Sequence, residues 1–182
     1  PPVAARTGAV ADEARSPTGS PPADGRRDGT GQGKAAPKER PAYSGPLRVR
    51  LATEVPAAVA GQRVAVHVIV EGAADVASVP FHLVFDPGVL RFQGSVQGPF
   101  LQSDGTSAVL MAAVTSSGDR VVVGDSRLGP VAGVSGSGEV CTLFFTVVAA
   151  GQSPLSFDQA SVWDSHGTVL PAQFESTAVV LN

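Results

Sequence analysis

The stretch Val79-Pro-Phe-His-Leu-Val-Phe-Asp-Pro-Gly-Val-Leu-Arg-Phe92 indicates the fold class of this chain. Its large apolar residues Phe81, Leu83 and Phe85 occupy every second position, which is the period of a strand that buries one face. Asp-Pro-Gly follows at 86–88 and predicts a tight turn, in which Pro fixes φ and Gly takes a positive φ. A second apolar run returns to the core immediately after the turn. The stretch therefore predicts two successive strands joined by a short connection.

The same pattern continues toward both ends of the chain from this stretch. Apolar runs rich in β-branched residues recur about every ten residues, and Gly, Asp, Ser and Pro lie between them. No stretch of a dozen residues keeps an apolar 3.6-residue period without Gly or Pro. Many strands without intervening helices predict a two-sheet sandwich, with Pro171 breaking the last strand. The nine predicted strands cover 47–52, 64–70, 81–85, 89–92, 108–114, 120–125, 140–148, 155–162 and 169–181.

The composition changes sharply near Gly45. Residues 1–45 contain no Leu, Ile, Phe, Trp or Met, and they hold 7 of the 15 Pro and 7 of the 21 Gly. Such a segment cannot bury enough apolar surface to offset about 1–2 kcal/mol of backbone entropy per ordered residue. We therefore predict a disordered Pro/Gly-rich linker at 1–45, and one β-sandwich domain at 46–182. The linker has 7 basic and 5 acidic residues, whereas the domain has 6 and 11.

Charge and composition exclude several classes of function. The formal net charge of −3 has the wrong sign for a general nucleic-acid binder. No apolar run approaches the ~20 residues that a membrane-spanning helix needs. The single cysteine, Cys141, cannot form an internal disulfide or a Cys-clustered zinc site. It shares parity with Leu143 and Phe145, so we expect it to be a small buried hydrophobe.

Four stretches occur in a characteristic order along the domain. They are Gly61-Gln-Arg-Val-Ala-Val-His-Val68, Val79–Phe92, Gly138-Glu-Val-Cys-Thr-Leu-Phe-Phe-Thr-Val147 and Val162-Trp-Asp-Ser-His-Gly-Thr-Val169. Their order resembles that of the cohesin domain, a nine-stranded jelly-roll module. Within them, Phe-Asp-Pro-Gly-Val-Leu at 85–90 is similar to the family's Tyr-Asp-Pro-x-x-Leu segment. The segments 98–105 and 133–138 resemble those of cohesin-type domains in bacterial envelope proteins. The resemblance thus implies a nine-stranded jelly-roll β-sandwich preceded by the linker.

The resemblance also implies a binding surface. In cohesins, the third, fifth, sixth and eighth strands form the face that binds a dockerin, a small calcium-loaded helical module. We expect these strands near 78–85, 107–115, 120–127 and 154–163. Dockerin-binding cohesins place Asn and Asp where this chain has small or apolar residues, and a lost charged hydrogen bond there costs about 1.5–3 kcal/mol. The expected partner-binding face consists of Ser78, Pro80, His82, Val84, Gly124, Asp125 and Arg127.

No residue pattern predicts a catalytic or metal-binding centre. The three His lack the close spacing of zinc ligands, and no nucleophile elbow precedes a helix. A glycosidase would need two carboxylates facing each other across a sugar, which sequence alone does not locate. Calcium near Asp75 or Asp164 is a further alternative, although no Asp-x-Asp-x-Asp-Gly loop supports it. We therefore expect no enzymatic activity, no metal site and no cofactor.

The leading interpretation is a non-catalytic protein–protein interaction module of cohesin type. It would tether a dockerin-like module, or a secretion or envelope component, in an extracellular or cell-envelope assembly. The alternative is a carbohydrate-binding module linked to polysaccharide degradation, and a weak hydrolase is the third hypothesis. For sugar binding the chain offers one indole, Trp163, without a row of exposed aromatic residues, and this favours a packing role for it.

Overall fold

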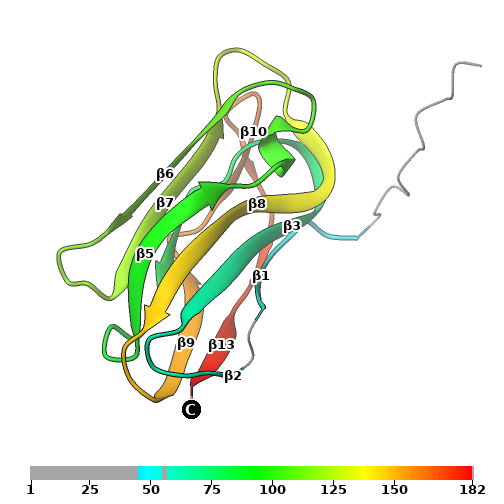
Figure 1. Ribbon diagram of the computed structural model, residues 1–182. Helices are drawn as coiled ribbons and strands as arrows, with labels where there is room; N and C mark the ends of the chain where they lie inside the picture. The colour runs from blue at the N-terminus through cyan, green and yellow to red at the C-terminus, as the bar shows by residue number, and fades with distance from the viewer. Residues whose placement is uncertain (1–44, 55–56, 182) are drawn as a thin grey trace, which may run out of the picture. The chain divides into compact units, whose positions relative to one another are not determined.

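The computed structural model describes residues 45–54 and 57–181 (Figure 1). Except for Gly45, the predicted linker at 1–45 lies outside the described residues. Within them, the chain forms thirteen strands and one short 3₁₀ helix. Nine strands have four or more residues, as many as the sequence predicted. The strands are β1 (Arg48–Thr53), β2 (Ala57–Ala58), β3 (Arg63–Ser78), β4 (Phe81–Val84), β5 (Leu90–Gln97), β6 (Ala108–Val114), β7 (Arg120–Arg127), β8 (Val134–Val147), β9 (Gly151–Asp158), β10 (Val162–Asp164), β11 (Val169–Leu170), β12 (Gln173–Glu175) and β13 (Thr177–Leu181), and the helix is η1 (Phe100–Gln102).

The strands form two layers of a jelly-roll sandwich. One layer has the order β5-β8-β3-β1-β12, and the other has the order β6-β7-β4-β9-β13-β2. All pairs are antiparallel except β1 with β12 and β13 with β2. Figure 1 shows β5, β8, β3 and β1 side by side, with β7 and β9 behind them. The predicted all-β jelly-roll class is therefore confirmed.

The long strand β3 joins the two layers at one end of the sandwich. Its ladder with β8 shifts register twice between Val70 and Val76. Gly72 and Asp75 adopt positive φ values of 71° and 58° in this region. Beyond the bend, Ser78 pairs with Ser126 of β7 in the other layer. The irregularity is what lets one strand contribute to both layers.

The core lies between the layers and is mostly aliphatic. Alternate residues are buried along the first half of β3, as the period of two predicted, whereas β8 also buries four consecutive residues, 140–143. Phe145 of β8 packs edge-to-face against Phe85 and Phe92, with ring centroids 5.1 and 5.6 Å apart. Each such ring contributes about 1.5–3 kcal/mol through burial. Cys141 is also fully buried, so its expected role as a small hydrophobe is confirmed.

The Asp-Pro-Gly turn forms, but not with the predicted backbone. An Asp86 Oδ1 atom accepts a hydrogen bond from the Gly88 N–H at 2.8 Å. The Asp86 carbonyl accepts further bonds from the N–H groups of Val89 and Leu90, at 3.1 and 2.9 Å. This right-handed turn leaves Gly88 outside the positive-φ glycines, so that prediction is wrong. Glycine still fits best, because an added Cβ would lie only 3.1 Å from the Asp86 carboxylate.

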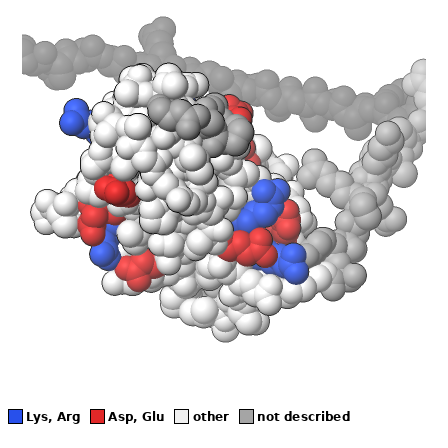
Figure 2. Space-filling model, turned by 90° about the horizontal axis from the view of Figure 1, so that it is seen from below, with Lys and Arg blue, Asp and Glu red and all other residues white. Residues whose placement is uncertain are grey.

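Charged residues are few and are mixed on the domain surface. Figure 2 shows the end of the sandwich that lies lowest in Figure 1, where most atoms belong to uncharged residues. Basic and acidic side chains lie beside one another there, and not in separate patches. On this side the surface therefore lacks the single-sign field that steers binding to a polyanion or polycation.

Among the described residues, no helix is long and apolar enough to cross a membrane.

Candidate functional site

The four strands expected to carry the binding face are neighbours in one sheet. β4 pairs with β7 on one side and with β9 on the other, and β6 pairs with β7 at the edge. The order β6-β7-β4-β9 therefore gives one continuous surface of the sandwich, which we call the outer face. Its residues are those whose side chains point away from the core on these four strands. The expected grouping of the four strands is confirmed.

Strand β4 places two expected residues on the outer face. Phe81 and Leu83 are buried in the core, whereas His82 and Val84 between them are half-buried and point outward. The buried Nδ1 atom of His82 has no hydrogen-bond partner among the described residues. Gly124 of β7 also lies on this face, and nothing lies within 4 Å of an added Cβ there. The centre of the outer face therefore consists of two half-buried side chains beside a glycine.

Asp125 and Arg127 do not lie on the outer face, and this part of the prediction is wrong. Both share parity with Val121 and Val123, whose side chains fill the core. Asp125 is 0% exposed and Arg127 is 8% exposed. Burial is possible because each charged group meets polar partners between the layers. A partner protein on the outer face cannot contact either side chain.

The partners of Asp125 come from the opposite layer. The Nε2 atom of Gln97 on β5 donates to both carboxylate oxygens of Asp125, at 2.7 and 2.9 Å. Burial raises the pKa of Asp125 to about 6, and the hydrogen bond from Gln97 opposes the rise. Burial also raises the pKa of the nearby Cys141 thiol. The Asp125 carboxylate thus links the two layers through Gln97, and the free energy needed to bury its charged form depends on pH.

Arg127 anchors the segment around η1. Its Nη1 atom donates to the Leu101 carbonyl at 2.6 Å, and its Nη2 atom donates to Asp104 at 2.6 Å. Only 1% of the Arg127 side chain is exposed, against 50% for Asp104. The hydrogen bond from the guanidinium is the main cause that holds the pKa of Asp104 far below its usual range. This pair is a structural tether of the 3₁₀ turn to β7.

An apolar strip lies on the β6 and β7 side of the outer face. Met111 is 71% exposed, Val109 is 42% exposed and Val122 of β7 is 39% exposed. Ala113 is exposed beside Val122, to which it is directly paired. Sequence reasoning missed these residues as candidates. The signal was present, since the segment 108–114 is apolar at both parities although it lies in a strand with one solvent-facing side.

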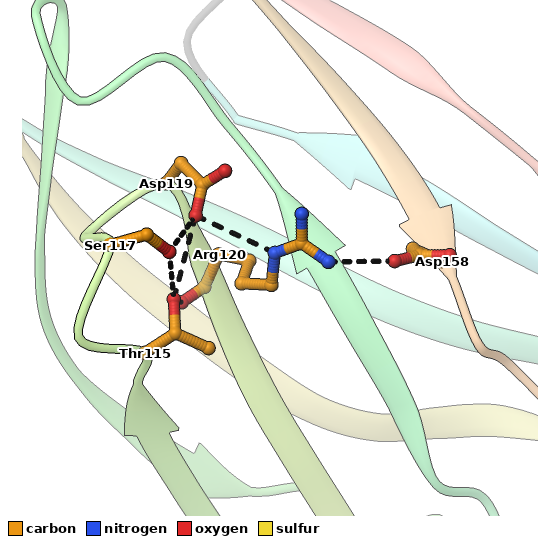
Figure 3. Close-up of polar contacts among 5 residues, drawn as sticks. All are labelled: Thr115, Ser117, Asp119, Arg120 and Asp158. Atoms are coloured by element: carbon orange, nitrogen blue, oxygen red, sulfur yellow. Dashed lines mark hydrogen bonds and ion pairs between the residues drawn. The ribbon is translucent and has the colours of Figure 1, made fainter.

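A polar cluster closes one end of the outer face (Figure 3). The Arg120 Nη1 atom donates to Asp158 of β9 at 2.9 Å, so this side chain reaches across β4. Its Nε atom lies 3.5 Å from Asp119. The Ser117 hydroxyl donates to Asp119 and is the main cause of the lowered pKa of that carboxyl, with Arg120 second. Thr115 contacts the Ser117 hydroxyl at 2.9 Å and completes the cluster.

Ser78 and Pro80 are occupied by contacts within the domain. The Ser78 hydroxyl lies 2.6 Å from the hydroxyl of Ser126, and the two side chains satisfy each other. The Pro80 carbonyl accepts a hydrogen bond from the Ser161 N–H at 3.0 Å. Neither residue supplies the free carboxylate or amide that the cohesin resemblance would place there. These two positions therefore differ from the polar ones that the resemblance implies for a dockerin-binding face.

The structure brings together the two acidic residues that were considered for calcium. Single ligand atoms of Asp75, Asp164 and His166 lie within 4.8 Å of one another. The oxygens of Asp75 already accept hydrogen bonds from Gly133 N–H and Ser165 Oγ, both at 2.7 Å. The bond from Ser165 is the main cause of the lowered pKa of Asp75. These contacts give the group a role in holding the β3 bend against the β10–β11 turn.

A hollow of about 410 Å³ lies away from the outer face, beside the start of β1. Prolines and small or aliphatic residues line it, and its lining contains no titratable side chain. The hollow thus offers no group for acid–base or nucleophilic chemistry. Its lining consists of Pro46, Leu47, Gly72, Ala74, Leu170, Pro171, Ala172 and Gln173.

These features define a class: a jelly-roll β-sandwich with one sheet face that carries an exposed apolar strip. The fold is that of cohesin modules. A non-cellulosomal cohesin from Archaeoglobus fulgidus superposes with a TM-score of 0.63 at 20% identity, over 76% of this chain and 92% of that one. A type II cohesin from the Acetivibrio cellulolyticus cellulosome gives 0.64 at 13% identity, over 74% and 95%. The sixth cohesin of scaffoldin B from Acetivibrio cellulolyticus, solved in complex with a Cel5 dockerin, gives 0.62 at 17% identity, over 76% and 100%.

The likeness is one of structure and not of sequence. No protein-family model matches this chain, and no curated protein matches it. The predicted cohesin-like fold is confirmed by the structural neighbours. They do not distinguish the envelope-type variant that the sequence motifs suggested.

Proposed function

We propose that this domain is a non-catalytic protein-binding module of cohesin type that holds its partner on the outer face. The observation that carries the proposal is the uncovered strip formed by Val109, Met111 and Val122 on that face. Contiguous exposed apolar side chains mark interaction surfaces on soluble domains. Cohesins of the same fold have been solved with dockerins bound. The fold and the surface chemistry therefore support the same kind of function.

The partner that fits this face best is a compact module with an apolar ridge. The Ser78–Ser126 pair leaves few free polar groups at the centre, so affinity must come mainly from apolar burial around Met111 and Val122. Asp119 and Asp158 at the polar end can meet a basic rim on the partner, since Arg120 alone offsets them. We infer a dockerin-like helical module in an extracellular or cell-envelope assembly. A component of a secretion system or of the cell envelope is the second candidate partner.

Binding measurements on matched lysine variants test this proposal. Candidate partners are calcium-loaded dockerin modules and proteins encoded beside this chain's own gene. We expect at least one to bind in a calorimetric titration, and Val122→Lys to weaken binding about tenfold or more, because a buried charge displaces apolar contact. The control Val96→Lys alters a residue that is 55% exposed on β5 of the other layer and should leave affinity unchanged. Equal losses in both variants, or no binding by any candidate, would count against the outer face as the site.

The carbohydrate-binding alternative is not favoured by the surface. Among the described residues, the exposed large hydrophobic side chains are all aliphatic. Trp163 is half-buried, and its indole N–H donates to the Ser161 hydroxyl at 2.8 Å. A sugar platform needs an accessible aromatic face. A saturable polysaccharide isotherm that Trp163→Ala abolishes would reverse this preference.

A further inference from the structure

Strand β6 is an edge strand whose outer edge makes no strand pairing among the described residues, although part of β6 lies close to β5 of the other layer. It pairs with β7 along all seven residues and with no other strand in the described part of the chain. Half of the backbone N–H and C=O groups of such a strand point away from the sheet and remain available for a further strand. Met111 belongs both to this edge strand and to the outer face, but pairing at the edge does not require that the outer face binds a partner.

The other edge strands of the described residues are blocked in ways that β6 is not. The layers otherwise end in β2 and β12, and the β10–β11 hairpin beside β3 ends in β11; these three strands have only two or three residues each. Strand β5 is longer, but its ladder shifts register between Phe92 and Gly94 and it carries Arg91. Short strands, bulges and charges are the usual protection against edge-to-edge pairing. β6 has none of them.

The sequence of β6 favours pairing. Its seven residues, Ala-Val-Leu-Met-Ala-Ala-Val, include no charged residue, proline or glycine, and its register with β7 is unbroken. Met111 is the most exposed large hydrophobic side chain among the described residues, at 71%. It occupies the midpoint of the strand. A strand added beside β6 would therefore cover the most exposed apolar side chain that the structure describes.

We propose that two copies of this domain associate by antiparallel pairing of their β6 strands about a twofold axis at Met111. In this register Met111 lies opposite Met111 of the second copy, Val109 lies opposite Ala113, and all seven residues are matched. Cross-strand pairs of apolar side chains stabilise such a ladder. An antiparallel edge contact is isologous, so one surface serves both copies. The result is a sheet that continues through the dimer.

The charges near β6 permit this arrangement. The twofold axis brings the Asp104 end of one strand toward the Asp119 end of the other. Asp104 is neutralised by Arg127, and Asp119 lies beside Arg120. Since Asp119 and Asp158 share the single Arg120 guanidinium, one net negative charge remains at that end, and it would meet the neutral Asp104–Arg127 pair of the second copy. A single strand pair buries less than the ~800 Å² per partner of a stable interface, so we expect a weak, reversible association that appears only at high protein concentration.

Sedimentation of the full chain across a concentration series tests the association. The wild type is expected to shift reversibly from monomer to dimer as concentration rises. Met111→Lys should weaken the dimer about tenfold or more, because two like charges then lie directly opposite each other. Val122→Lys should leave the dimer intact, since Val122 is one strand further from the edge. A wild type that stays monomeric throughout, or a dimer that Val122→Lys disrupts equally, overturns the proposal.

Cysteine cross-linking tests the register. Opposed residues of an antiparallel pair have Cα atoms about 4.5–5.5 Å apart, within the range of a disulfide. Met111→Cys is therefore expected to form a covalent dimer on mild oxidation. Ala113 is also exposed, but Ala113→Cys should not form this dimer, because the two copies of residue 113 would lie about 14 Å apart. The native Cys141 is buried and contributes no background.

The two cysteine variants also distinguish other occupants of the edge. If an extended segment of another protein is the true occupant, Met111→Cys stays monomeric when purified, and the proposal fails. If Ala113→Cys cross-links as well as Met111→Cys, the contact is nonspecific, and the register is wrong. Unchanged thermal midpoints of both variants show that the fold is intact, as expected for exposed positions.

Discussion

Asp125 is the residue whose environment departs most from its predicted one. A fully buried carboxylate with a pKa of about 6 binds its proton more tightly in the folded chain than in the unfolded chain. The folded state is therefore favoured at low pH, and this contribution is lost as pH rises from about 4 through 6. The difference corresponds to at most about 3 kcal/mol. The hydrogen bonds from Gln97 are what make the charged form tolerable above that range.

The variant Asp125→Asn isolates this effect. It keeps the shape of the side chain but removes the titration, so the stability difference between variant and wild type should change between pH 4 and pH 7 in favour of the variant. Chemical denaturation at a series of pH values measures it. The lowered pKa values of Asp75, Asp104 and Asp119 act at lower pH, are shared by both proteins and cancel in the difference. A difference that is constant with pH would show that Asp125 does not titrate in this window.

Cys141 gives a second prediction for a single residue. It is fully buried, and burial raises the pKa of its thiol, so the reactive thiolate is scarce and inaccessible. We expect no reaction of the native protein with a thiol reagent over the time in which the denatured protein reacts with one equivalent. Rapid labelling of the native state would show that the contact between β5 and β8 opens, because Gln97 is paired with Cys141 in that ladder.

For individual strands, the clarity of the alternation between apolar and polar residues determined how well the strand and its buried side could be predicted. β4 and the turn after it followed from Phe81, Leu83 and the Asp-Pro-Gly sequence, because a strong period of two and a turn-forming tripeptide are local signals. The orientation of the β7 side chains was harder to predict, since the charge of Asp125 favoured exposure whereas its alternation with Val121 and Val123 favoured burial. Asp125 is buried because Gln97, which is distant in sequence, supplies its hydrogen-bond partner. The apolar surface of β6 was missed because its neighbours determine which of its two apolar sides is covered.

The backbone just after β5 lies very close to the middle of the neighbouring strand β8, and this leads to a prediction about Gly98. A Cβ added at Gly98 would lie 2.2 Å from the Glu139 carbonyl oxygen and 2.7 Å from the Val140 carbonyl carbon. Relieving this clash would require a shift of the β8 backbone, so Gly98→Ala should destabilise the domain by about 2 kcal/mol or more. Gly124→Ala is the matched control, since nothing lies within 4 Å of its added Cβ and its φ is not positive.

Thermal unfolding of the two glycine variants measures the difference. Gly98→Ala is expected to lower the midpoint by several degrees, about 2–4 °C for each kcal/mol in a domain of this size. Gly124→Ala should stay near the wild-type value. Similar midpoints for the two variants would mean that Gly98 lies further from the middle of β8 than the structure has it. The comparison therefore tests this close backbone approach after the end of β5.

In the molecule as a whole, the core and the proposed binding surface lie on opposite sides of the same sheet. The inner sides of β4, β7 and β9 build the core, whereas the outer sides of β6 and β7 carry the apolar strip, and the Arg120 cluster reaches from β7 to β9. Exposed substitutions such as Val122→Lys can thus change binding without unfolding the domain, which is what makes the proposed function testable. The described core is also complete within one stretch of chain, since its residues run from Leu47 to Leu181.

This continuity leads to the last prediction, that a chain beginning at Gly45 folds on its own. We expect its thermal midpoint to lie within about 2 °C of that of the full chain, because every residue of the described core is retained. A shorter chain beginning at Gly61 is the contrast. It lacks β1, which pairs with β3 over six residues and buries Leu47, Val49 and Leu51. It should lose most of its stability, since each lost aliphatic side chain removes about 1.5–3 kcal/mol. If the chain beginning at Gly45 is destabilised as strongly as the one beginning at Gly61, residues before Gly45 belong to the folded unit, and the proposed boundary is wrong.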